Sequence, residues 1–192
     1  LSAAKSKMTN IFFEKKYEES TGISRKEFKE LRTPRTSIKL SDVILPNILF
    51  KTDRFKTLLE ELKSITVFAY DKFKFDKAIS YKGNTYAIGV GGLHTKDKAT
   101  LFRQTENTDI LSMDVRSFYP AIMCEYKIKP EHLQNDFLNI LEEVKDDRIL
   151  AKKAGDKVKS ETYKILINAT FGKLGSHLHW FYDPLALIRV TV

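Results

Sequence analysis

The sequence predicts an α+β fold, in which a small antiparallel sheet lies among helices. Apolar residues recur at helical spacing near the start of the chain and again over residues 137–174, whereas the middle alternates as strands do. Gly155-Asp156 interrupts the later helical stretch. Two long helices should therefore fold against each other as an antiparallel hairpin.

Residues 1–64 are predicted to be mainly helical. Ser24 followed by Glu27 is a capping-box pattern, which predicts a short helix that stops near Thr33. Thr52 can cap a further helix, in which the apolar side chains share one face.

The middle of the chain is predicted to form the sheet. Lys82-Gly83-Asn84 is a plausible hairpin turn between two alternating runs. The expected strands are residues 72–81, 85–90, 100–104 and 110–115. Helical structure should then resume at Ser117–Glu125, and Pro130 suits the first turn of another segment.

The last third should contain helices over residues 137–153 and 157–174, followed by a strand over the apolar run 185–192. The sequence thus divides into four parts: 1–64, 65–136, 137–174 and 175–192.

Composition favours nucleic acid or nucleotide as a partner. The net charge is +8, and Lys145 to Lys173 holds eight basic and four acidic residues. No apolar run approaches the ~18–20 residues of a membrane span, and no secretory signal is visible. The single cysteine, Cys124, excludes an internal disulfide and is interpreted as a small buried apolar residue.

The first segment whose residues can carry chemistry is Asp114-Val115-Arg116-Ser117-Phe118-Tyr119-Pro120. An aspartate at a strand end, before a turn into a helix, can present its carboxylate to a metal ion while the amides of the turn face phosphate oxygens. The alternative is an ordinary strand–turn–helix with a capping aspartate and a core tyrosine.

The second segment is Lys164-Ile165-Leu166-Ile167-Asn168-Ala169-Thr170-Phe171-Gly172. Lys164, Asn168 and Phe171 fall on one helical face, so a cation, an amide and a ring can act together. On the preceding helix Arg148 and Lys152 also share a face, whereas Lys153 points about 100° away. Taken singly, each of these residues is more typical of a solvated helix surface.

In this order the segments resemble motifs A and B of family B DNA polymerases, which read Asp-x-x-Ser-Leu-Tyr-Pro and Lys-x-x-x-Asn-Ser-x-Tyr-Gly, with a basic helix pair between them. Three positions depart from the pattern: Phe118 replaces Leu, Ala169 replaces Ser and Phe171 replaces Tyr. The resemblance covers residues 85–192 and implies part of a palm domain followed by a fingers hairpin.

The resemblance implies roles for the first segment. Asp114 would bind both catalytic Mg²⁺ ions, and the Val115 carbonyl would help to hold one of them. Ser117 and Phe118 would offer backbone amides to the triphosphate, and Tyr119 would exclude a ribose 2′-hydroxyl.

It also implies roles for the fingers. Arg148, Lys152 and Lys164 would grip the phosphates, Asn168 would lie against the incoming nucleotide, and Phe171-Gly172 would pack beneath the nascent base pair.

A weaker similarity precedes motif A. Gly91 and Gly92 match the glycines of a Tyr-x-Gly-Gly segment that contacts the template strand in phage and protein-primed polymerases, although Gly89 stands at the tyrosine position. The alternative is a flexible strand end. His177 and His179 are interpreted as surface or DNA-facing residues.

The implied activity is template-directed addition of a dNTP to a primer 3′-hydroxyl by two-metal phosphoryl transfer. The partners would be primer–template DNA and dNTP, in the cytoplasm of a bacterial host of a phage or prophage. No Asp-Thr-Asp motif C occurs, and Asp183 stands alone. We therefore expect an excised part of a polymerase, with an exonuclease before it and motif C and thumb after it, that does not extend primers alone. The competing hypothesis is a non-catalytic nucleic-acid-binding module or a decayed remnant.

Overall fold

The structure, a computed structural model, describes residues 2–96, 98–115 and 117–192, with side chains from residue 11 onward. Its helices are α1 (Ser2–Thr21), α2 (Arg25–Glu30), α3 (Asp53–Ser64), α4 (Phe118–Glu125), α5 (Asp136–Lys153), α6 (Lys157–Lys173) and α7 (Pro184–Thr191). Its strands are β1 (Ser37–Lys39), β2 (Thr66–Phe68), β3 (Asp76–Tyr81), β4 (Asn84–Gly89) and β5 (Gly92–Thr95). The predicted α+β class is confirmed. None of the described helices has the length and hydropathy of a membrane span.

The strands form two small antiparallel sheets, β1–β2 and β3–β4–β5. The predicted hairpin turn between β3 and β4 is confirmed. Lys82 and Gly83 both have positive φ, 49° and 82°, as a two-residue turn between twisted strands requires.

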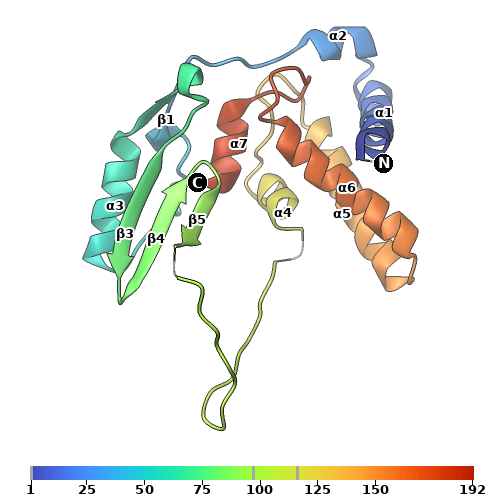
Figure 1. Cartoon of the computed structure of the whole chain (residues 1–192). Coiled ribbons are helices and arrows are strands. Elements are labelled where there is room, and N and C mark those ends of the chain that lie inside the picture. The colour runs from blue at the N-terminus through green and yellow to red at the C-terminus, as the bar shows by residue number, and fades with distance from the viewer. Residues whose placement is uncertain (1, 97, 116) are drawn as a thin grey trace.

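Two predicted helical features are also confirmed. The Ser24–Glu27 capping box opens α2, although this helix ends at Glu30, before the expected stop. The long helices α5 and α6 pack side by side around a break at residues 154–156 (Figure 1). Asp156 caps α6 by accepting from the Lys159 amide at 2.9 Å.

The molecule has two hydrophobic cores. The first lies among α1, α4, α5 and α6 and includes an aromatic group around Phe13, Trp180 and Phe181. The second lies between α3 and the two sheets and includes Ile38 and Val67. Figure 1 shows the corresponding halves on either side of α7 and α4.

Helix α7 replaces the strand that was predicted for residues 185–192, so that prediction is wrong. Asp183 accepts hydrogen bonds from the first-turn amides and Pro184 occupies the first turn, which is a standard helix start. Ala186 and Val190 face the first core, whereas Ile188 faces the second. Because α7 is buried on two sides, it is mostly apolar, and only Arg189 and Thr191 in its last turn are polar.

The predicted strands at residues 100–104 and 110–115 are absent from the described chain. Residues 98–115 instead form an extended arm that projects from the body (Figure 1), with one isolated bridge between Thr105 and Thr108. Their composition is typical of strands, but no neighbouring strand lies beside them in the described chain. A strand needs such a neighbour to accept and donate its backbone hydrogen bonds. Pro130 likewise precedes a turn rather than a helix.

Asp183 is a buried carboxylate that joins three parts of the chain. Its Oδ1 accepts from the Leu185 amide at 3.1 Å, its Oδ2 accepts from the Glu131 amide at 3.0 Å, and Arg35 lies 3.4 Å away. The side chain is only 2% exposed. A charge buried to this degree is stable only when donors surround it, so its partners are held in place.

Asp183→Ala should therefore destabilise the fold by about 3–5 kcal/mol, because it leaves three amides without their acceptor and leaves Arg35 with Glu131 as its remaining carboxylate partner. Urea unfolding followed by circular dichroism measures this loss. Asp156→Ala removes an exposed cap with one amide partner and should cost only ~1 kcal/mol. Equal losses in the two variants would contradict the special role of Asp183.

His179 is a partly buried neutral histidine that packs against Trp180 and Phe181 of the first core. Its Nδ1 accepts a hydrogen bond from the Phe181 amide at 3.1 Å, so that nitrogen carries no proton. Burial, and then the nearby charges of Lys173, Arg32 and Lys29, lower the pKa of His179 from 6.5 to about 3. The unfolded chain thus binds a proton below pH ~6.5 that the folded chain does not.

The free energy of unfolding should fall as the pH drops below ~6.5, by up to ~1.4 kcal/mol per pH unit from this residue. His179→Asn should remove about 1 kcal/mol of the difference in unfolding free energy between pH 7.5 and 5.5, as measured by urea denaturation. His177→Asn, at an exposed site two residues away, is the matched control. If both variants keep the wild-type pH dependence, His179 is not its source.

Candidate functional site

The first turn of α4 contains the central residues of motif A. Ser117 adopts a left-handed conformation, φ 52° and ψ 49°, directly before the helix. Its hydroxyl does not cap α4 but accepts a hydrogen bond from Arg148 of α5. The first-turn amides of α4 therefore have no side-chain cap, and the beginning of a helix with free amides attracts anions. Arg116 lies outside the described residues.

Tyr119 of motif A stacks on Phe171 of motif B. Their ring centroids are 4.2 Å apart and the planes differ by 17°. Both rings are partly exposed and rest on the first core. The structure thus joins two residues that are 52 positions apart in the sequence, and it leaves part of each ring open to a ligand.

Arg148 and Lys152 line one small pocket on α5, with a volume of about 190 Å³. Because Arg148 also donates to Ser117, this basic pocket begins next to the first turn of α4. The Nε of Arg148 is buried and has no hydrogen-bond partner in the described part of the chain. Lys153, expected to point away, lines the same pocket. In the sequence, only the position of Lys153 next to Lys152 indicated that it would line this pocket.

Lys164 and Asn168 lie exposed on α6. The Tyr163 hydroxyl donates to Asp147 at 2.8 Å, which places the turn of α6 holding Lys164 beside the turn of α5 holding Arg148. Burial, followed by this hydrogen bond, raises the pKa of Tyr163 to about 12. The Lys164 Nζ itself is 3.5 Å from Glu161, and Lys164 does not line the pocket of Arg148 and Lys152 or the neighbouring pocket at the α5–α6 break. The expected convergence therefore brings Arg148 and Lys152 together, and Lys164 only to the neighbouring turn.

Gly91 and Gly92 line a groove of about 490 Å³ together with Phe118, Tyr119 and the end of α7. Gly92 has φ +96°, and a Cβ there would lie 3.0 Å from the Thr191 carbonyl oxygen. Glycine is thus required at this position by the fold alone. Gly91 has open space around it, so a strand or nucleotide can approach its backbone.

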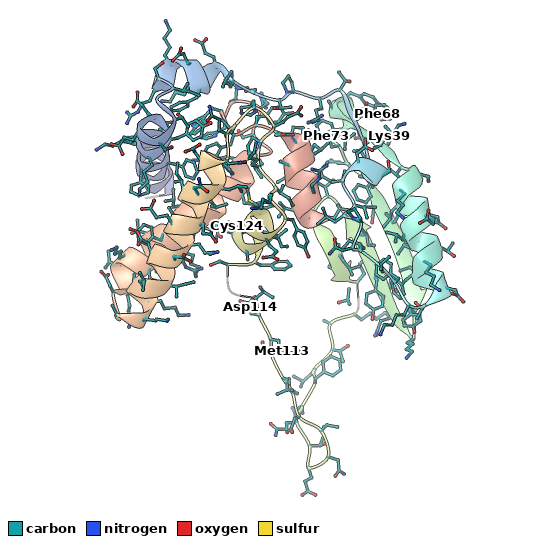
Figure 2. All side chains as sticks on the ribbon, turned by 180° about the vertical axis from the view of Figure 1, so that it is seen from behind. Lys39, Phe68, Phe73, Met113, Asp114 and Cys124 are labelled. Atoms are coloured by element: carbon teal, nitrogen blue, oxygen red, sulfur yellow. The ribbon has the colours of Figure 1, made fainter. Side chains whose placement is uncertain are left out.

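Asp114 is not at a strand end, contrary to the prediction. It lies on the exposed arm shortly before α4, next to Met113, which is 90% exposed (Figure 2). Among the described residues no three His, Cys, Asp or Glu side chains gather as a metal site. Mg²⁺ binding needs carboxylates plus further oxygen ligands, so Asp114 and the exposed Val115 do not by themselves fit the expected two-metal site.

Cys124 lies on α4 and is half-buried against the first core. Burial raises the pKa of its thiol above the ordinary value. A thiol of this kind is poorly ionised near neutral pH, in agreement with a packing role.

Comparisons with protein-family models, with curated proteins and with solved structures found no match to this chain.

The Tyr119–Phe171 stack can be tested by a double-mutant cycle. The two alanine variants should couple by about 0.5–1.5 kcal/mol in unfolding free energy, because stacked rings contribute beyond their buried area. Phe118 contacts Tyr119 but has no ring contact with Phe171, so Phe118→Ala and Phe171→Ala should be additive within ~0.5 kcal/mol. A coupling energy near zero for Tyr119 and Phe171 would show that the stack is not formed in solution.

Proposed function

We propose that this chain contains the deoxynucleotide-binding part of a family B DNA-directed DNA polymerase. The supporting observation is the convergence of the three segments that resemble this family. The stack of Tyr119 on Phe171 joins motif A to motif B, and the hydrogen bond from Arg148 to Ser117 joins the basic helix to motif A. The resemblance rests on residue types alone, so their proximity in space is independent support.

The arrangement suits a nucleoside triphosphate. Its phosphates would lie between the uncapped start of α4 and the basic residues Arg148 and Lys152, with Lys164 closing from α6. Backbone amides at a helix start and a guanidinium fork are both suited to phosphate oxygens. The sugar would then lie against Tyr119 and the base pair near Phe171, whose ring is already held by the stack.

In the complete enzyme the primer 3′-hydroxyl would attack the α-phosphorus of the dNTP and pyrophosphate would leave. Asp114 remains the proposed motif A carboxylate. Since the described residues do not assemble a metal site, we assign binding and positioning of the nucleotide to this chain. The DNA partner would be a primer–template, and the proposed location is the cytoplasm of a bacterial host.

One observation favours the competing function, a nucleic-acid-binding module without catalysis. Asp114 lies on an exposed arm, and the described residues place no cluster of carboxylates around it, as expected for a module without a metal site. Such a module has no need to recognise a triphosphate, so nucleotide binding separates the two functions.

Lys164→Ala and Lys152→Ala should each weaken dNTP binding about ten- to hundredfold, since a hydrogen bond to a charged group contributes ~1.5–3 kcal/mol. Both side chains are exposed, so the fold should survive the substitutions. Binding is measured by isothermal titration of the chain with dNTP in the presence of Mg²⁺ and a primer–template duplex. Lys63→Ala on α3, paired with Glu60, is the matched control and should change affinity less than twofold.

Inorganic tripolyphosphate should displace the dNTP, because the proposed contacts are mainly to phosphates. Absence of dNTP binding by the wild-type chain would overturn the polymerase proposal and favour the binding module. Equal effects of Lys63→Ala and Lys164→Ala would place the nucleotide elsewhere.

A further inference from the structure

Two stacked aromatic side chains are exposed at the end of β2, far along the chain from motifs A and B. Phe68 and Tyr70 have ring centroids 5.2 Å apart and planes that differ by only 19°. Phe68 is 40% exposed and Tyr70 is 85% exposed. Neither ring belongs to either core, so packing does not account for the pair.

Three lysines lie near this aromatic pair, together with one exposed acidic residue, Asp71. Ser37 pairs with Phe68 and Lys39 pairs with Thr66, so Lys39 emerges on the same face of the β1–β2 sheet as Phe68 (Figure 2). Lys72 and Lys74 follow in the next turn and are also exposed. Within the described residues none of these three lysines forms an ion pair, so their charge is available to a ligand.

A pocket of about 430 Å³ adjoins the pair. Its walls include Ala69 and Lys72, which flank Tyr70 in the chain, together with Phe73, His177 and Tyr182. This volume lies within the ~300–1,000 Å³ of small-ligand sites. Aromatic walls with hydroxyl and imidazole groups suit a flat, polar-edged ring such as a nucleobase.

The pocket lies next to the groove of about 490 Å³ beside Tyr119. Val90 lines the pocket, whereas Gly91 and Gly92 line the groove that contains Tyr119. Helix α7 likewise contributes to both, through Ile188 on one side and residues 189–192 on the other. A polymer that leaves the groove over this turn therefore reaches the pocket next.

We propose that Phe68, Tyr70 and the adjoining pocket bind single-stranded DNA. One base stacks on the exposed Tyr70 ring, a neighbouring base enters the pocket, and the lysines neutralise phosphates. Single-stranded DNA fits better than duplex, because the faces of paired bases are covered by their neighbours. The choice of DNA as the polymer rests on the proposed function, whereas the position of the surface rests on its own geometry.

The test is fluorescence anisotropy of a labelled oligo(dT) titrated with the full chain. Tyr70→Ala and Phe68→Ala should each weaken binding roughly 5- to 100-fold, as base–aromatic stacking contributes ~1–3 kcal/mol per base. Phe102→Ala, which removes a 76% exposed ring on the arm, should change affinity less than twofold. Equal losses in the three variants, or unchanged affinity in all, would overturn the proposal.

Two further measurements identify the occupant. Tyr70→Trp keeps a ring at the site, so it should retain affinity and its fluorescence should be quenched by oligo(dT). Lys72→Ala should lower the slope of log K against log[salt] by about 0.7, the value for one phosphate of a single strand. If the Tyr70→Ala variant loses affinity equally for a blunt duplex of the same length, the ligand is not a single strand and the proposal fails.

These outcomes are distinct from those of the nucleotide titration. If the wild-type chain does not bind dNTP but binds oligo(dT) in a way that depends on Tyr70, only the polymerase proposal is overturned. Normal dNTP binding with oligo(dT) affinity indifferent to Tyr70 would overturn this surface alone.

Discussion

The fold depends on the buried carboxylate of Asp183. Removing a carboxylate from water costs several kcal/mol unless hydrogen-bond donors and a cation replace the solvent. Here the Leu185 and Ala186 amides, the Glu131 amide and the Arg35 guanidinium do so. Because these donors come from three separate stretches of chain, satisfying one charge fixes where α7 begins, where the turn before α5 lies and where the segment leaving α2 passes.

The position of α7 in turn determines the site. Its two buried faces pack on different cores, so it sets the distance between the helical half and the sheet half. Its C-terminal turn approaches Gly92 so closely that only glycine fits, and this contact brings the β4–β5 turn to the groove beside Tyr119. The groove beside Tyr119 is therefore a product of packing between the halves, whereas the Tyr119–Phe171 stack belongs to the helical half alone.

Sequence reasoning succeeded where a signal is local. The capping box of α2, the Lys82-Gly83 turn and the break between α5 and α6 are each encoded within a few residues. It failed for α7, because a short helix that is buried on two sides is mostly apolar and resembles a buried strand. It failed for the arm, because strand composition cannot show whether a neighbouring strand exists. The spacing of the motifs suggested that Lys164 and Arg148 lie near each other, and their helical turns are neighbours. The stack of Tyr119 on Phe171 could not be predicted in this way, because it depends on tertiary packing.

The structure holds the groups proposed to bind a nucleotide more firmly than the carboxylate proposed for catalysis. The candidate binding groups lie on helices whose orientations are fixed by the first core, and a preorganised group loses little entropy when it binds a ligand. Asp114 instead lies on an arm that makes few contacts with the body, so its carboxylate is not held at the ~0.5 Å precision that metal chemistry needs. In the proposed function the phosphate-binding groups would therefore come from the helical half, the groove beside Tyr119 would also need the sheet half, and catalysis would need further contacts that fix the arm beside α4.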